Sequence, residues 1–164
     1  MVMWVNNITM SKICDHTSVG MFVWKEGKLL LIERKKFPFG FAVPAGHVDG
    51  DKTFEEAALR ELREEVGLEC ISMKKIFEGR KENRCRREDG AWHLWKLYKT
   101  ETSGDLDRSK DETKQANWYS QEQIEVLALK TEEYRIGNVS EADWEQSPGL
   151  EPIMFDFLKE LKII

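Results

Sequence analysis

Residues 46–68 read GHVDGDKTFEEAALRELREEVGL, and this stretch decides the fold of the chain. Thr53, followed three residues later by Glu56, is typical of a helix start, and Gly67 is typical of a helix end. The apolar positions between them recur at helical spacing: Ala58, Leu59, Leu62 and Val66. We therefore expect an amphipathic helix that Thr53 caps and that ends at Val66.

Another face of this helix carries three carboxylates. Glu61, Glu64 and Glu65 are spaced i, i+3 and i+4, so they lie on one side of the helix, although like charges at this spacing destabilise it slightly. Hard divalent cations take oxygen ligands, and Mg2+ usually keeps coordination positions for a substrate's phosphates. The pattern favours a Mg2+ site, and a solvated acidic helix face is the alternative.

The segments around this helix predict an alternation of strands and helices. Apolar, β-branched and aromatic runs predict strands at 17–24, 29–34, 71–78, 91–100 and 117–119. Two further helices are expected at 121–129, after Ser120, and at 153–161, after Pro152, whereas the polar segment 102–115 is expected to be a loop. The alternation predicts a single α/β or α+β domain.

The stretch from Gly46 to Leu68 closely resembles the Nudix box, G-x5-E-x7-R-E-U-x-E-E-x-G-U, in which U is aliphatic, and eight of its nine specified positions match. The preceding residues, FAVPAGHVD at 41–49, resemble the usual approach to that box. The resemblance implies a Nudix-type α/β/α sandwich with a central mixed β-sheet. We expect one domain over residues 16–164, with residues 1–15 as an N-terminal leader or tail and Met10 as an alternative start.

One position departs from the box. Lys52 stands where the family has its first glutamate, which commonly pairs with the box arginine, here Arg60. Glu56 lies four residues before Arg60 and could take that place, and Asp49 or Asp51 could substitute. The departure leaves the three metal carboxylates intact and puts the rigidity of the loop in question.

The resemblance implies a metal-dependent hydrolase. Glu61, Glu64, Glu65 and the Gly46 carbonyl would bind Mg2+, with Mn2+ as a substitute, and water would attack a pyrophosphate linkage in a nucleoside diphosphate joined to another group. A carboxylate must take the proton of that water. Glu64 is one candidate, and Glu112, in the loop before Trp118, is the other.

The candidate substrate contacts are basic or aromatic side chains. Arg34 resembles a position that often meets substrate phosphate, and Arg84, Arg86 and Arg87 could make bidentate phosphate contacts. Phe39 is a candidate for stacking on a base, and so are Trp92, Trp95 and Trp118. Solvated charges and core aromatics are the alternatives.

The substrate class rests on size and on absent markers. Segment 80–87 lacks both the proline often found in ADP-ribose hydrolases and the tyrosine often found in dinucleoside polyphosphate hydrolases. The compact chain favours a nucleoside triphosphate or a damaged nucleotide. The alternatives are a nucleotide-sensing module without hydrolysis and an RNA 5′-end pyrophosphohydrolase.

Charge and composition restrict the partners. The 164 residues carry a net charge of −5, which argues against a broad electrostatic interface with nucleic acid. Residues 46–70 hold eight acidic side chains against three basic ones, whereas residues 74–88 hold seven basic against three acidic. This juxtaposition suits a metal ion beside a polyanion, and two solvated faces are the alternative. We expect a small-molecule nucleotide as partner and leave the oligomeric state open, a homodimer included.

No apolar run approaches the length of a membrane helix, and the N-terminus lacks the features of a secretory signal. Three widely spaced cysteines favour a reducing compartment, so we expect a cytoplasmic protein. Cys14-x-His16 lacks a second ligand pair for zinc. We interpret His47 and His93 as hydrogen-bonded structural residues.

Overall fold

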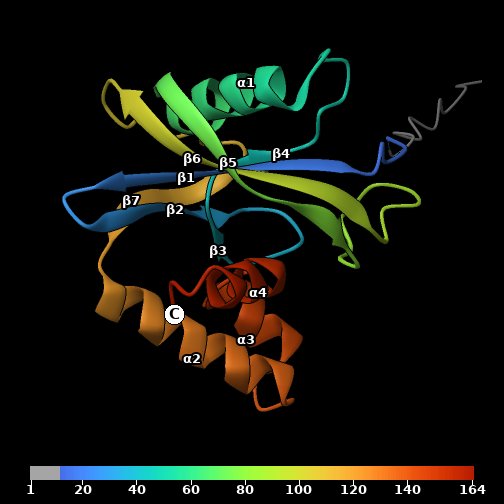
Figure 1. Cartoon of the computed structure of the whole chain (residues 1–164). Helices are drawn as coiled ribbons and strands as arrows, with labels where there is room; N and C mark the ends of the chain where they lie inside the picture. The colour runs from blue at the N-terminus through green and yellow to red at the C-terminus, as the bar shows by residue number, and fades with distance from the viewer. Residues whose placement is uncertain (1–11) are drawn as a thin grey trace, which may run out of the picture.

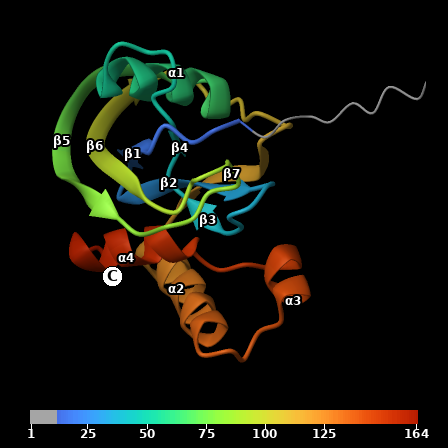
Figure 2. The same ribbon diagram turned by 90° about the vertical axis from the view of Figure 1, so that its right-hand side faces the viewer.

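The computed structural model describes residues 12–164. A twisted sheet lies between helix α1 on one face and helices α2 to α4 on the other (Figures 1 and 2). The strands are β1 (Thr17–Lys25), β2 (Lys28–Arg34), β3 (Phe41–Ala42), β4 (Ala45–Gly46), β5 (Glu69–Lys81), β6 (His93–Ser103) and β7 (Thr113–Tyr119). The helices are α1 (Phe54–Val66), α2 (Gln121–Arg135), α3 (Glu141–Gln146) and α4 (Pro152–Glu160).

The sheet is mixed. Its strand order is β3-β2-β1-β6-β5, β4 pairs with β1, and β7 pairs with β2. β1 runs parallel to β6, while its pairings with β2 and β4 are antiparallel. The α/β/α sandwich with a central mixed sheet, predicted from the box and its flanks, is confirmed.

The central strands bury both of their faces. In β1, Val19, Met21 and Val23 pack in the core beneath α1, whereas Phe22 packs in the core shared with α2 and α4. β2 alternates in the same way between the two cores. Strands buried on both faces read as continuous apolar runs, which is why LLLI at 29–32 is uninterrupted.

Helix α1 has the predicted bounds. The Thr53 hydroxyl accepts the Glu56 N–H at 3.0 Å, and Gly67 ends the helix in the left-handed conformation with φ of 69°. The reciprocal half of the expected capping box is different, because the Glu56 carboxylate accepts the N–H of Lys52 rather than that of Thr53. Glu56 therefore ties the preceding loop to the helix.

Other boundaries differ from the prediction. β5 and β6 pair over a long antiparallel ladder from Glu69 to Lys81, and β7 begins at Thr113, inside the segment expected to be a loop. Helix α2 continues past Leu129 to Arg135 because the buried Thr131 hydroxyl bonds carbonyl oxygens on its own helix and after α3. Helix α3 was not predicted.

The expected leader lies mostly outside the described residues. Within its described part, Ile13 forms a bridge with Glu88, and Cys14 is buried. Between residues 12 and 164, no helix is long and apolar enough to cross a membrane.

Candidate functional site

Arg60 clamps the loop before α1 onto the helix. Its Nε donates to Asp51 Oδ2 at 2.8 Å, and its Nη2 donates to the His47 carbonyl oxygen at 2.8 Å. Its Nη1 donates to Glu61 Oε1 at 2.8 Å and to Glu64 Oε2 at 3.2 Å. One guanidinium thus joins the loop to the acidic face of α1.

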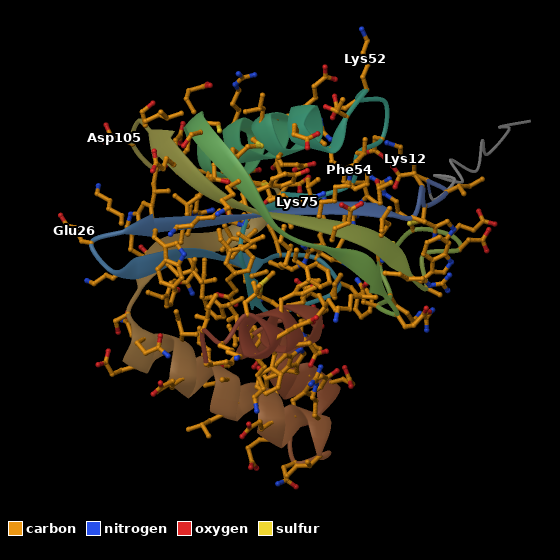
Figure 3. The ribbon with its side chains drawn as sticks, viewed as in Figure 1. Lys12, Glu26, Lys52, Phe54, Lys75 and Asp105 are labelled. Atoms are coloured by element: carbon orange, nitrogen blue, oxygen red, sulfur yellow. The ribbon has the colours of Figure 1, made fainter. Side chains whose placement is uncertain are left out.

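Asp51 fills the place of the glutamate that the box lacks. Lys52 points away from the body of the molecule (Figure 3), and its backbone N–H is held by Glu56. Of the candidates weighed from the sequence, Asp51 therefore pairs with Arg60, and Glu56 and Asp49 have other partners.

The three carboxylates of α1 differ in exposure. Glu61 and Glu65 are buried, whereas the Glu64 side chain is 62% exposed. Burial raises the pKa of Glu61 to about 7 despite the nearby Arg60. Burial also raises the pKa of Glu65, and Glu61 adds to the effect. Two buried acids held together therefore need a positive charge beside them to ionise.

Two features of this acidic cluster fit a bound cation. Glu65 Oε2 is buried and has no hydrogen-bond partner among the described residues. Gly46 leaves room for Glu61, because a Cβ at Gly46 would stand 2.1 Å from Glu61 Oε1. A buried carboxylate oxygen without a partner, with a second carboxylate packed against the backbone of Gly46, is an arrangement that a hard divalent ion satisfies.

The carboxylates line a cleft of about 230 Å3. Glu112 also lines it and lies close enough to raise the pKa of both Glu61 and Glu65. The structure brings nearly all the residues singled out from the sequence to this cleft: Arg34, Gly46, Glu61, Glu64, Glu65, Arg84, Arg86, Arg87 and Glu112.

The basic residues at the cleft are not equivalent. Arg87 forms a two-pronged pair with Asp49, at 2.5 and 3.0 Å, and Arg34 Nε donates to the Pro38 carbonyl oxygen at 2.7 Å. Arg84 and Arg86 are exposed and form no salt bridge within residues 12–164. They are the arginines most available for an anionic ligand.

Phe39 lies outside this cleft. It lines an adjacent cavity of about 370 Å3, which shares Phe37, Pro38 and Arg84 with the cleft and is closed by Tyr134 and Trp144. The rings of Tyr134 and Trp144 stack at 4.0 Å. Sequence reasoning missed this wall because it comes from the end of α2 and from α3.

The tryptophans have structural partners. Trp92 stacks on His16 at 4.1 Å, with Arg80 also over its ring, and Trp118 packs against the core beneath α1. Trp95 is buried, although it also lines the cleft. Trp92 and Trp118, in contrast, do not line the cleft.

A second cluster, of cysteine and histidine, was also missed. It comprises Cys14, His47, Cys85 and His93. Burial lowers the pKa of His47 to about 4 and lowers that of His93, so both rings are neutral at pH 7. Its members are far apart in sequence and no spacing rule links them, so only the fold reveals the cluster.

The comparisons with known proteins agree with this geometry. The NUDIX domain family model matches residues 15–140. An ADP-ribose pyrophosphatase from Methanocaldococcus jannaschii is 47% identical over 53 residues, which cover 31% of each chain. An 8-oxo-dGDP phosphatase, NUDT18, from Danio rerio is 28% identical over 120 residues, covering 70% of this chain and 35% of the relative.

These matches span about a third of the length of the two curated relatives. Among solved structures, a NUDIX hydrolase from Nitrosomonas europaea superposes with a TM-score of 0.60 at 18% identity, covering 90% of this chain and 88% of that one. At this low sequence identity, the structural similarity supports the fold alone. Because the family model extends over most of the chain and the box lies within it, this chain belongs to the NUDIX domain family.

Proposed function

We propose that this chain hydrolyses a pyrophosphate bond in a nucleotide, with Mg2+ as cofactor and Mn2+ as a substitute. The observation that carries the proposal is the convergence of Glu61, Glu64 and Glu65 with the exposed Arg84 and Arg86 at one cleft. An acidic cluster suited to a cation beside unpaired guanidinium groups is complementary to a metal-bound polyphosphate. The two curated relatives, named for nucleotide substrates, support this class.

The acidic face and Gly46 would hold the cation. The unpartnered Glu65 oxygen and the Glu61 carboxylate packed against Gly46 fit this assignment. When bound, a divalent ion supplies neutralisation of phosphate charge and a lowered pKa for water. Arg84 and Arg86 bind phosphate oxygens through paired N–H donors and orient the chain of phosphates along the cleft.

A carboxylate takes the proton from the attacking water. The water oxygen bonds to phosphorus, the anhydride P–O bond breaks, and the proton passes to Glu64 or Glu112. Glu64 is exposed but accepts a hydrogen bond from Arg60, whereas Glu112 is exposed on the loop before β7 and forms no salt bridge among the described residues. Both are candidates, and Glu112→Gln distinguishes them, because Glu64 is also an expected metal ligand.

The adjacent cavity would take the nucleoside. Its walls combine the Phe37-Pro38-Phe39 loop with Tyr134 and Trp144, and it joins the cleft through Arg84. Aromatic and apolar walls suit a base, which stacks on them. We propose a nucleoside triphosphate or a damaged nucleotide as substrate. ADP-ribose is the second candidate because of the 47% identity to the archaeal pyrophosphatase around the box.

The test is phosphate and pyrophosphate release from a nucleotide panel with Mg2+, with Mn2+ and with chelator. The panel holds ordinary and oxidised nucleoside di- and triphosphates, ADP-ribose, dinucleoside polyphosphates and 5′-triphosphate RNA. We expect metal-dependent turnover of one small-nucleotide class. Tight nucleotide binding with no turnover would refute hydrolysis and support the sensing alternative, and preferred turnover of the RNA would refute the small-molecule substrate.

Glu64→Gln, Glu112→Gln and the control Glu69→Gln then test the site. Removing a general base or a metal ligand should lower kcat roughly 100-fold. Glu69 is an exposed carboxylate that pairs with Arg63 outside the cleft, so its amide variant should keep wild-type activity. Full activity in both Glu64→Gln and Glu112→Gln would contradict the assignment of the base.

A further inference from the structure

The cysteine–histidine cluster gathers four ligand atoms from four separate segments. Cys14 precedes β1, His47 follows β4, Cys85 lies in the β5–β6 loop, and His93 begins β6. One ligand atom of each lies within 4.8 Å of all the others. The described residues contain no other such group of three or more His, Cys, Asp or Glu side chains.

The distances in the cluster match those in a tetrahedral zinc site. Cys14 Sγ lies 3.6 Å from His47 Nε2 and 3.3 Å from His93 Nε2. Zinc bonds of about 2.3 Å to sulfur and about 2.0 Å to nitrogen, at the tetrahedral angle, place S and N about 3.6 Å apart. Cys14 Sγ and the two imidazole nitrogens therefore already lie near the edge length of a Zn2+ tetrahedron, and all four ligand atoms lie within 4.8 Å of one another.

We propose that this cysteine–histidine cluster binds one Zn2+ ion in a structural site. Four protein ligands of the Cys2His2 type close the coordination sphere, which is the arrangement of structural rather than catalytic zinc. The mixed thiolate and imidazole ligands select zinc over Mg2+, which requires oxygen. His47, Cys85 and His93 line the same cleft as the carboxylates of α1, but the proposed site uses none of those carboxylates.

The surroundings orient the ligands as a zinc site requires. Asn83 Oδ1 accepts the Trp95 Nε1–H at 3.0 Å, so this atom of the amide is the oxygen, an acceptor. The same oxygen lies 3.3 Å from His93 Nδ1, which must therefore carry the proton. The lone pair of His93 is then on Nε2, which faces Cys14 Sγ.

Backbone N–H groups support negative charge on both sulfur atoms. The N–H of His16 lies 3.3 Å from Cys14 Sγ, and the N–H of Arg87 lies 3.4 Å from Cys85 Sγ. Gly90 gives Cys85 the room it occupies, since a Cβ there would stand 2.2 Å from the sulfur. Donors aimed at each sulfur stabilise the thiolates that bind metal.

The Cys14 sulfur faces two ring nitrogens, because the Nε2 atoms of His47 and His93 lie 3.6 and 3.3 Å from it. Without a metal, one of these nitrogens can accept the thiol proton, and the other must carry a proton of its own and donate to the sulfur. A single Zn2+ ion accepts the lone pairs of both imidazoles and both thiolates together.

The ion would also organise the cleft. His47 directly follows Gly46, and Cys85 stands between Arg84 and Arg86. Zinc would therefore link the loop between β5 and β6, which carries the arginines, to the end of β4 and to the start of the loop before α1. Its role is to hold Arg84 and Arg86 beside the cleft.

The test measures metal content and needs no enzymatic activity. The wild type, Cys14→Ser and Cys85→Ser are purified with the controls Cys70→Ser and Glu64→Gln, exchanged into excess Mg2+, and analysed by mass spectrometry for zinc. We expect about one zinc ion per chain in the wild type and in both controls, and a loss of about tenfold or more in each serine variant of the cluster.

A wild type without zinc after incubation with the ion would overturn the proposal, and so would loss of zinc in Glu64→Gln. Cobalt substitution of the wild type covers the case in which a serine variant fails to fold. We expect the absorption spectrum of tetrahedral Co2+ with sulfur ligands, and an octahedral, oxygen-ligated spectrum would refute the site. A Cys14–Cys85 disulfide in protein purified with reductant would also refute it.

Discussion

Replacing Asp51 by Asn removes the carboxylate that receives the Arg60 Nε–H at 2.8 Å. Arg60 and Asp51 are 29% and 24% exposed, so solvent weakens their pair without abolishing it. A hydrogen bond to a charged group contributes about 1.5–3 kcal/mol when shielded. Exposed ion pairs contribute about 0.2–1 kcal/mol. For this intermediate exposure we expect a loss of about 1–2 kcal/mol.

The assay is thermal unfolding with chelator, so that metal binding does not contribute. For a chain of this size, about 1–2 kcal/mol corresponds to a fall in Tm of about 2–8 °C. Glu56→Gln is the matched control, because its carboxylate only accepts the backbone N–H of Lys52. We expect the control to lose less than half as much stability.

A double variant tests whether the role of the box glutamate has moved by one residue. Lys52→Glu alone should change stability by less than about 0.5 kcal/mol, since Lys52 points into solvent and Arg60 is already paired. In the Asp51→Asn background, the carboxylate that Lys52→Glu introduces should recover part of the loss by pairing with Arg60. Equal losses in Asp51→Asn and Glu56→Gln, with no recovery in the double variant, would refute this role for Asp51.

Three substitutions and one metal titration probe the acidic cluster and Glu151, a further residue of the cleft wall. Gly46→Ala should keep the fold and lower metal-dependent turnover at least tenfold, because its Cβ displaces the Glu61 carboxylate. Unchanged kcat and metal affinity would contradict this. Mg2+ at about 100 times its Kd should stabilise the wild type by about 2.7 kcal/mol, measured as a rise in Tm that chelator reverses. Glu65→Gln should abolish that rise while raising the metal-free Tm, because it removes a buried acid whose Oε2 has no partner among the described residues. An undiminished rise would contradict the ligand assignment. Burial raises the pKa of Glu151, so the wild type loses stability as the pH rises above the pKa that this group has in the unfolded chain. The Tm of Glu151→Gln should equal that of the wild type near pH 4 and exceed it near pH 8. A difference in Tm that does not change with pH would contradict the raised pKa.

Local signals explain which parts of the fold were predictable. The bounds of α1 follow from its Thr53 cap, its helical period and the left-handed Gly67, all of which lie within or next to the helix. Helix α2 was predicted too short because its last turns are polar, and Thr131 is buried only through its contact with the Leu150 carbonyl group. A contact with the segment after α3 cannot be read from periodicity.

In the site too, features set by local sequence were predictable, and features set by distant contacts were not. The shared face of Glu61, Glu64 and Glu65 follows from helical geometry, so the sequence predicts it, although their role as ligands stays a prediction. The sequence did not decide which carboxylate pairs with Arg60. The i, i+4 spacing favours Glu56, whereas in the structure the loop before α1 brings Asp51 to the guanidinium. The cysteine–histidine cluster needed the parallel pairing of β1 with β6, which no local pattern encodes.

The pairing of charges distinguishes a polyanion site from two solvated faces. Arg80 is engaged by Glu82 and the ring of Trp92 within the basic segment, whereas Arg87 pairs with Asp49 of the acidic segment. The basic residues left exposed at the cleft without a salt bridge among the described residues are Arg84 and Arg86.

On the acidic side, Arg60 partly neutralises Glu61 and Glu64, but Glu65 keeps a buried oxygen without a partner. Two solvated faces that only steadied each other would pair the remaining groups as well, in the way that Arg87 and Asp49 are paired. Among the described residues of the cleft, Glu65 and the exposed Glu112 on the acidic side and Arg84 and Arg86 on the basic side stay without a salt bridge. That remainder is the complement of a divalent cation carrying a phosphate chain, which supports the polyanion interpretation.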